Sequence, residues 1–271
     1  MWVSRTIAVL FGFAGLCATL PVLAAEPIVE VVSRGQKIRA ILLKPEKPVA
    51  SVILLAGGHG NLQIAPDGAI GWGRRNQVVR TRANYQAAGF AVLVPDIAPD
   101  WKAPGQKGGV VQGYRFNPVH GGDIGALVEY MRGIAEPVFI VATSRGAVTA
   151  GVALLGADGK RKPDGMVLPS PMLVPVEPRV PSFIRAIQGN KAKAQVPMLL
   201  VGHRKDTCRW TLPETLEQFR AWRGGGDIEI VFLDGEPGSG DPCQTEAAHG
   251  FYGIDQQVVD IVAGWIKRQK R

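Results

Sequence analysis

Six short apolar runs, separated by stretches of helical character, organise the chain between residues 51 and 267. They are rich in Val, Ile and Leu, which is typical of strands covered on both faces. Before them, residues 28–32 and 38–43 alternate apolar and polar side chains around Gly35, which predicts a hairpin. This order predicts a doubly wound, mostly parallel α/β sheet with helices on both faces. The six predicted strands are residues 51–55, 90–94, 138–141, 166–168, 198–201 and 228–232.

Five helices are expected between and after these strands. In the last one, the apolar side chains between Val258 and Ile266 share one helix face. No linker divides residues 26–271, so a single domain is expected. The glycine-rich loops 61–73 and 95–122 are longer than most connections, and such loops often carry function. The predicted helices are residues 75–88, 122–135, 146–155, 213–223 and 255–267.

Residues 1–25 have the three parts of an export signal. The positive Arg5 precedes an apolar stretch, residues 6–20, and small residues end the segment. The stretch is shorter than the ~20 residues of a membrane span. We therefore expect cleavage near Ala25, no stable membrane anchor, and a periplasmic or secreted protein of net charge +7 instead of +8. Lipidation at Cys17 is the alternative, although Leu16 stands where a small residue is expected.

The basic balance, 31 Lys and Arg against 23 Asp and Glu, does not by itself indicate nucleic-acid binding. The charges are spread thinly, without zinc-finger spacing or an aromatic–basic stripe. The one dense basic run, residues 267–271, ends a predicted helix, where positive charge is favourable. We therefore expect no nucleic-acid partner.

Ser144 lies between a predicted strand and a predicted helix, with the small residues Ala142 and Gly146 around it. This pattern is close to Gly-x-Ser-x-Gly, which holds a serine at a sharp strand-to-helix turn and exposes its hydroxyl. The next N–H, that of Arg145, would then point toward a developing oxyanion. An ordinary serine N-cap of the helix is the alternative interpretation.

A nucleophilic serine needs a base, and His249 is the expected one. In such sheets the chain order is nucleophile, acid, base. His59 and His120 precede Ser144, and His203 leaves no room for an acid ahead of it, whereas His249 follows the last predicted strand.

The acid is expected on the loop after strand 198–201, where Asp206 lies. Asp206 would hold the imidazole tautomer and stabilise the imidazolium. Asp241 and Glu246 are alternatives on the histidine's own loop.

A second oxyanion donor is expected after strand 51–55, from the N–H of Gly58 or His59. A dinucleotide loop is disfavoured because Gln63 stands at the third glycine position, and no Gly-Lys-Ser/Thr follows for a phosphate loop. His59 has no partner at metal-ligand spacing. We therefore expect neither a cofactor nor a metal.

Export would leave Cys208 and Cys243 as an even pair in an oxidising compartment. Cys208 follows Asp206 by two residues and Cys243 precedes His249 by six. A bridge between them would tie the loop of the acid to the loop of the base. Two unrelated buried thiols are the alternative.

Together, these residues resemble the α/β-hydrolase family over essentially all of residues 26–271. More narrowly, the Asp-x-Cys at Asp206 and the Cys243 ahead of His249-Gly-Phe are similar to exported bacterial hydrolases of the carboxylesterase and dienelactone-hydrolase type. Only residues 170–195 lie where the family often has its lid, so little or no lid is expected.

The resemblance implies an exported serine hydrolase that cleaves a small-molecule carboxylic ester through an acyl-enzyme. Amide or thioester cleavage, and a non-catalytic binding protein on the same fold, are the alternatives. His203, Arg204 and Lys205 beside the acid, with Arg145 beside the serine, suggest a basic rim that would favour anionic or aromatic-acid esters, and a solvated run of charges is the alternative.

Overall fold

The computed structural model describes residues 26–106 and 108–269. The expected signal peptide, residues 1–25, lies outside the described residues, as do the last two residues of the basic run. Within the described ranges, no helix is both long and apolar enough to cross a membrane.

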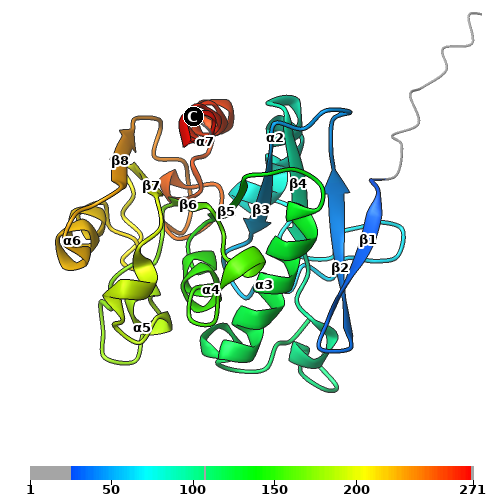
Figure 1. The fold of residues 1–271 in the computed structure, drawn as a ribbon. Coiled ribbons are helices and arrows are strands. Elements are labelled where there is room, and N and C mark those ends of the chain that lie inside the picture. Colours follow the sequence, from blue (N-terminus) through cyan, green and yellow to red (C-terminus); the bar gives the residue numbers. More distant parts are fainter. Residues whose placement is uncertain (1–25, 107, 270–271) are drawn as a thin grey trace, which may run out of the picture.

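One sheet of eight strands runs through the molecule (Figure 1). Its strand order is β1-β2-β4-β3-β5-β6-β7-β8. β1 and β2 form the hairpin, β2 pairs antiparallel with β4, and all pairs from β4 to β8 are parallel. The prediction of a doubly wound, mostly parallel sheet is therefore confirmed. The strands are β1 (Ile28–Ser33), β2 (Gln36–Leu43), β3 (Ala50–Leu55), β4 (Phe90–Pro95), β5 (Val138–Ala142), β6 (Gly165–Pro169), β7 (Met198–His203) and β8 (Ile228–Leu233).

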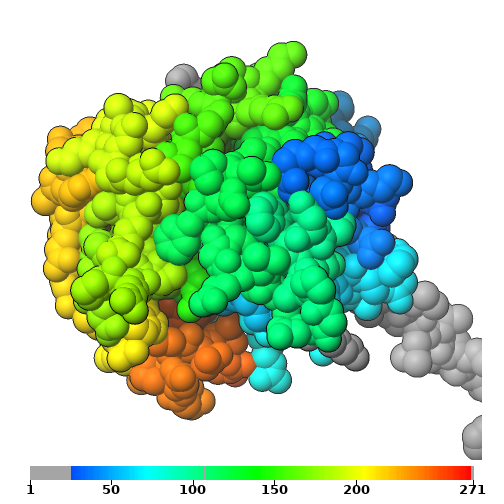
Figure 2. Space-filling model, turned by 90° about the horizontal axis from the view of Figure 1, so that it is seen from below, coloured from blue at the N-terminus to red at the C-terminus, as the bar shows by residue number. Residues whose placement is uncertain are grey.

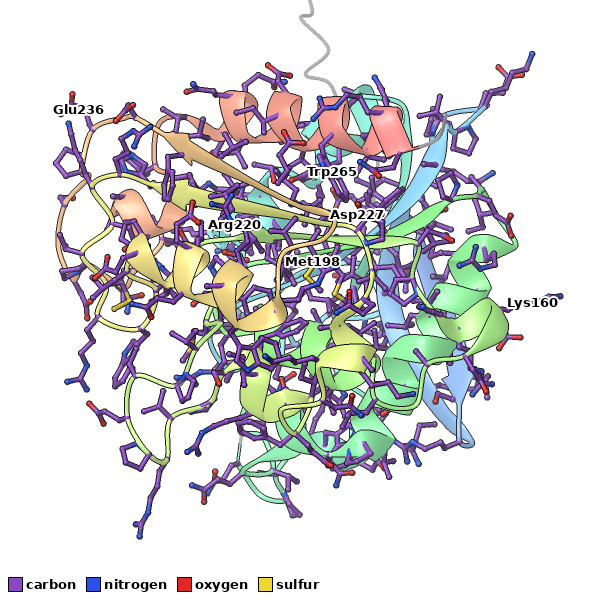
Figure 3. All side chains as sticks on the ribbon, turned by 60° about the vertical axis from the view of Figure 1, so that its left-hand side comes forward. Lys160, Met198, Arg220, Asp227, Glu236 and Trp265 are labelled. Atoms are coloured by element: carbon purple, nitrogen blue, oxygen red, sulfur yellow. A yellow bond between two sulfur atoms is a disulfide. The ribbon has the colours of Figure 1, made fainter. Side chains whose placement is uncertain are left out.

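Helices cover both faces of the sheet, and each face has its own apolar core. One core joins the sheet to α3, α4, α5 and α6, and the other joins it to α1, α2 and α7. Figure 3 shows Met198 of β7 and Trp265 of α7 pointing into the interior, one in each core, while Lys160 and Glu236 project outward. The helices are α1 (Gln77–Arg80), α2 (Arg82–Ala87), α3 (Pro118–Arg132), α4 (Gly146–Ala153), α5 (Phe183–Ala186), α6 (Glu214–Arg223) and α7 (Asp255–Gln269).

Two helix predictions need correction. The single helix expected over residues 75–88 is two short helices that meet at Thr81, whose hydroxyl donates to the Gln77 carbonyl 2.8 Å away. Such a bond from a threonine to the preceding turn bends helices. α3 begins at Pro118 rather than at residue 122, because the Asn117 side chain caps it and proline fits the first helical position.

The segment between β6 and β7 contains little regular structure. It holds α5, which is four residues long, and the 3₁₀ turn Lys191–Ala194. No longer helix of the described chain lies in this segment, in agreement with the expectation of little or no lid.

Candidate active site

Ser144 stands at a strained turn between β5 and α4. Its φ is +53°, a left-handed conformation that is uncommon for a residue other than glycine. The turn is held from both sides, because the Ser144 N–H donates to the Pro169 carbonyl and its own carbonyl accepts from Met172, each at 3.2 Å. A methyl group at Gly146 would lie 2.4 Å from the Leu55 carbonyl oxygen, so only glycine fits there. The turn therefore has the geometry of a nucleophile elbow.

The Asp206 carboxylate lies beside the His249 ring. Asp206 Oδ2 is 3.2 Å from His249 Nδ1, and both residues are buried. The other carboxylate oxygen, Oδ1, accepts from the Cys208 N–H at 2.9 Å. With Asp206 accepting from Nδ1–H, the Nε2 of His249 is left as the acceptor.

Thr211 is a third member of this contact, which the sequence analysis did not anticipate. Its hydroxyl donates to Asp206 Oδ2 at 3.0 Å and lies 2.9 Å from His249 Nδ1. Thr211 is fully buried beside the pair. It therefore fixes both the carboxylate and the ring from one side.

Cys208 and Cys243 form a disulfide. It joins the loop that carries Asp206, after β7, to the loop that carries His249, after β8. Both cysteines also line the same cavity as His249. The bridge is thus part of the cavity wall and links the two loops covalently.

A cavity of about 830 Å³ opens at the carboxyl ends of the strands, where doubly wound sheets bind ligands. Ser144, Arg145, His249 and Gly58 all line it. Ser144 Oγ makes no hydrogen bond with any other described residue. In unliganded hydrolases the contact between serine and histidine often tightens only when substrate binds. Seen from below in Figure 2, the orange segment of the His249 loop and the cyan segment after β3 meet at one edge of the molecule.

Several other loop residues of the cavity wall carry no signal in the sequence. Trp72 and Trp210 provide aromatic surface, together with Met172 after β6. Arg75 and Arg209 add positive charge at the mouth, where Arg209 stacks on the Trp210 ring at 3.9 Å. These side chains come from three separate loops, so no local sequence pattern links them.

The expectation of a basic rim formed by residues 203–205 and Arg145 is wrong for the first three of these residues. His203 is fully buried at the end of β7, where its Nδ1 accepts from the Lys205 N–H at 3.1 Å. Arg204 pairs with Asp234 at 3.3 Å. Neither these residues nor Lys205 line the cavity, so Arg145 is the one member of the expected rim that does.

The two alternative acids, Glu246 and Asp241, accept hydrogen bonds from groups other than His249. Glu246 accepts from Thr245 Oγ1 and from Arg75, each at 2.7 Å, and these two contacts lower its pKa in that order. Asp241 Oδ1 accepts from the Cys243 N–H at 2.8 Å. Both residues line the cavity, but the carboxylate within hydrogen-bond distance of His249 belongs to Asp206.

The two candidate oxyanion residues after β3 differ in what they face. Gly58 lines the cavity with a left-handed φ of +55°. The His59 ring stacks on Trp72, with centroids 3.6 Å apart, and its Nδ1 accepts from the Asn61 N–H. Burial, followed by the charge of Arg115, lowers the pKa of His59. No cluster of three potential metal ligands occurs among residues 26–106 and 108–269.

Solved structures share this architecture. A soluble variant of monoglyceride lipase from Saccharomyces cerevisiae superposes with a TM-score of 0.61 at 14% identity, covering 90% of this chain and 95% of the lipase. The chain has the α/β-hydrolase fold. Dienelactone hydrolase from Anabaena variabilis gives a TM-score of 0.58 at 15% identity, over 90% of this chain and 97% of that one.

A third structure with the α/β-hydrolase fold is esterase 2 of Thermogutta terrifontis, phosphoramylated by tabun. It matches with a TM-score of 0.56 and 15% identity, covering 91% of this chain and 96% of the esterase. No protein-family model matches the chain, and no curated protein matches its sequence. At these identities the similarity establishes the fold, and function has to be argued from the site.

Proposed function

We propose that the chain is a serine hydrolase that cleaves a carboxylic ester through an acyl-enzyme intermediate. One observation carries the proposal: the strained Ser144 and the Asp206-bound His249 line one cavity. The names of the structural neighbours, a lipase, a dienelactone hydrolase and an esterase, support hydrolysis. Amide and thioester substrates would use the same acyl-transfer chemistry, so the preference for small-molecule esters is part of the proposal.

In the first half-reaction, Ser144 Oγ attacks the ester carbonyl carbon while His249 Nε2 accepts the hydroxyl proton. The π electrons of the carbonyl move to its oxygen, which the N–H groups of Arg145 and of Gly58 or His59 stabilise. Asp206 keeps the proton of Nδ1 in place and stabilises the imidazolium.

Collapse of the tetrahedral intermediate breaks the bond to the alcohol oxygen, and His249 gives its proton to the departing alcohol. Water then attacks the acyl-enzyme with His249 again as the base. The second collapse releases the carboxylic acid and returns the proton to Ser144 Oγ. No redox partner or cofactor enters this balance.

Residues 1–25 are proposed to be a cleaved signal peptide that delivers the protein to the periplasm or the medium. The Cys208–Cys243 disulfide supports this, because structural disulfides persist in oxidising compartments. Edman sequencing of the exported protein should begin at Glu26. A start at Met1 in a membrane fraction would contradict cleavage.

The proposed function is tested by intact mass after treatment with a fluorophosphonate, with Ser144→Ala alongside. One adduct on the wild type and none on the variant is the expected result. Both proteins are then assayed on short-chain aryl esters, where the variant should lose at least about 1,000-fold in kcat. A folded wild type that takes no adduct would contradict an activated serine and favour a binding protein.

A further inference from the structure

Arg115 is a buried cation without a carboxylate partner. It lies in the 3₁₀ turn Tyr114–Phe116 at 6% exposure, and burial lowers its pKa. Within the described part of the chain it forms no ion pair with Asp or Glu. Burying a lone guanidinium is costly. Its Nε has no hydrogen-bond partner among the described residues, so its two Nη atoms make the compensating hydrogen bonds, and these go to groups around Ser144.

Those contacts are the carbonyl groups of the loop after β3. Arg115 Nη2 donates to the carbonyls of Ala56, Gly57 and Gly58 at 3.0, 3.3 and 3.2 Å. The neighbouring Tyr114 hydroxyl donates to the His59 carbonyl at 2.6 Å. Four consecutive carbonyls thus face the Tyr114–Arg115 pair.

This arrangement orients the N–H groups of the same loop. In a trans peptide, the carbonyl of one residue and the N–H of the next point in opposite directions. The N–H groups of residues 57–60 therefore point away from Arg115, and none of them donates a hydrogen bond to another described residue. Successive N–H groups around a left-handed residue form an anion-binding nest, and Gly58 has a φ of +55°.

The side of the loop that faces away from Arg115 is the side of the nucleophile. A methyl group on Gly57 would lie 3.0 Å from Ser144 Cβ. A methyl group on Gly60 would instead lie 2.3 Å from Arg115 Nη2. The loop is therefore pressed between the guanidinium and the serine.

Arg115 also contacts the helix that follows the nucleophile. Its Nη1 donates to the hydroxyl of Thr149 in α4, and this helix begins directly after Arg145. One side chain thus joins the two backbone segments from which the two oxyanion donors are expected. A network of this kind fixes donor positions before the charge develops.

We propose that Arg115 is a positioning residue for the oxyanion hole. By hydrogen-bonding the carbonyls of residues 56–58, Arg115 orients the N–H groups of the loop toward the space beside Ser144. Its positive charge also stabilises a negatively charged oxygen in that space. The inference rests on the proposed serine-hydrolase function and adds to it the device that orients the loop.

The test compares Arg115→Met with a matched control, Arg223→Met. Arg223 on α6 is also 6% exposed and has no carboxylate within ion-pair distance among the described residues. The probes are a fluorophosphonate, for the rate of labelling, and p-nitrophenyl acetate, for kcat and KM. Near-UV circular dichroism and thermal midpoints report folding and stability for each variant.

For folded Arg115→Met we expect labelling rate and kcat to fall about 100-fold, as for loss of one oxyanion donor, with KM within about 3-fold. Arg223→Met should keep both rates within about 3-fold despite a similar loss of stability. If Arg115→Met does not fold, Tyr114→Phe is the test variant. It should lower kcat about 3- to 10-fold at unchanged KM, as expected for one lost hydrogen bond.

Wild-type kcat in folded Arg115→Met, an effect on KM alone, or an equal loss in Arg223→Met would overturn the inference. If Arg115→Met fails to fold, a wild-type kcat in Tyr114→Phe would overturn the inference. These results leave the proposed function intact if the wild type is labelled at Ser144. A wild type that neither labels nor turns over would instead reject the proposed function, and the inference with it.

Discussion

Thr211 shows how a residue without any sequence signal can enter a site. The pattern around Ser144 and the chain order of Asp206 and His249 were readable because turn geometry and topology constrain them. Thr211 lies within hydrogen-bond distance of both Asp206 and His249 only because its loop folds back over them. A lone threonine in a loop carries no such information in the sequence.

Replacing Thr211 with valine should lower kcat/KM about 10-fold or more, because a hydrogen bond to a charged group contributes about 1.5–3 kcal/mol. Thr211→Ser keeps the hydroxyl and should stay within about 3-fold of the wild type. Steady-state kinetics on one aryl ester tests both variants. Equal losses in the valine and serine variants would assign the effect to packing instead.

His120 predicts a pH dependence of stability. It is buried in the first turn of α3, and burial, followed by the charge of Arg115, lowers its pKa to about 3. In the unfolded chain a histidine titrates near ~6.5. Between these two pH values the histidine is protonated in the unfolded state but not in the folded state. The free energy of unfolding therefore falls as the pH drops from about 6.5 toward 3.

Between pH 7 and pH 5 this single group should account for about 2 kcal/mol of the lost unfolding free energy. In His120→Leu the difference between the two pH values should shrink by that amount, as measured by urea unfolding. His203, whose pKa burial also lowers, remains in both proteins and cancels. An unchanged difference would mean that His120 takes up its proton in the folded state.

At the scale of elements, the strands and three of the five predicted helices, α4, α6 and α7, lie within two residues of their predicted bounds, whereas the helices expected over residues 75–88 and 122–135 do not. The strands match because buried parallel strands leave dense apolar runs. The start of α3 was missed although Asn117 and Pro118 signal it. The break at Thr81 was missed because one side-chain hydrogen bond decides it.

The disulfide predicts coupled losses of stability and activity. It closes a loop with a sequence separation of 35 residues, so removing it as Cys208→Ser with Cys243→Ser should cost about 2–4 kcal/mol. Because the bridge links the loops of Asp206 and His249, kcat should fall in the same variant. Urea unfolding and aryl-ester kinetics are the measurements. Full activity with lowered stability would restrict the bridge to a structural role.

At the scale of the whole molecule, topology explains why the sequence predicts where the candidate site lies but not which side chains form its walls. The loops after β3, β5, β7 and β8 meet at one edge because the strand order brings those strands' carboxyl ends together. The walls come from Trp72, Trp210 and the arginines at the mouth, whose meeting depends on loop paths. The anionic-ester hypothesis, built on adjacent charges in the sequence, was wrong about which charges reach the cavity.

The scarcity of regular structure between β6 and β7 has a kinetic consequence. The regular structure of this segment, within the described residues, is α5 and one 3₁₀ turn, so we expect no helical cap from this segment that has to move before substrate reaches Ser144. The rate on tributyrin should therefore rise smoothly through its solubility limit, as followed by titration of released acid. A sharp rise at that limit would contradict this. We therefore expect no interfacial activation, with turnover limited by acyl transfer or product departure rather than by the opening of a lid.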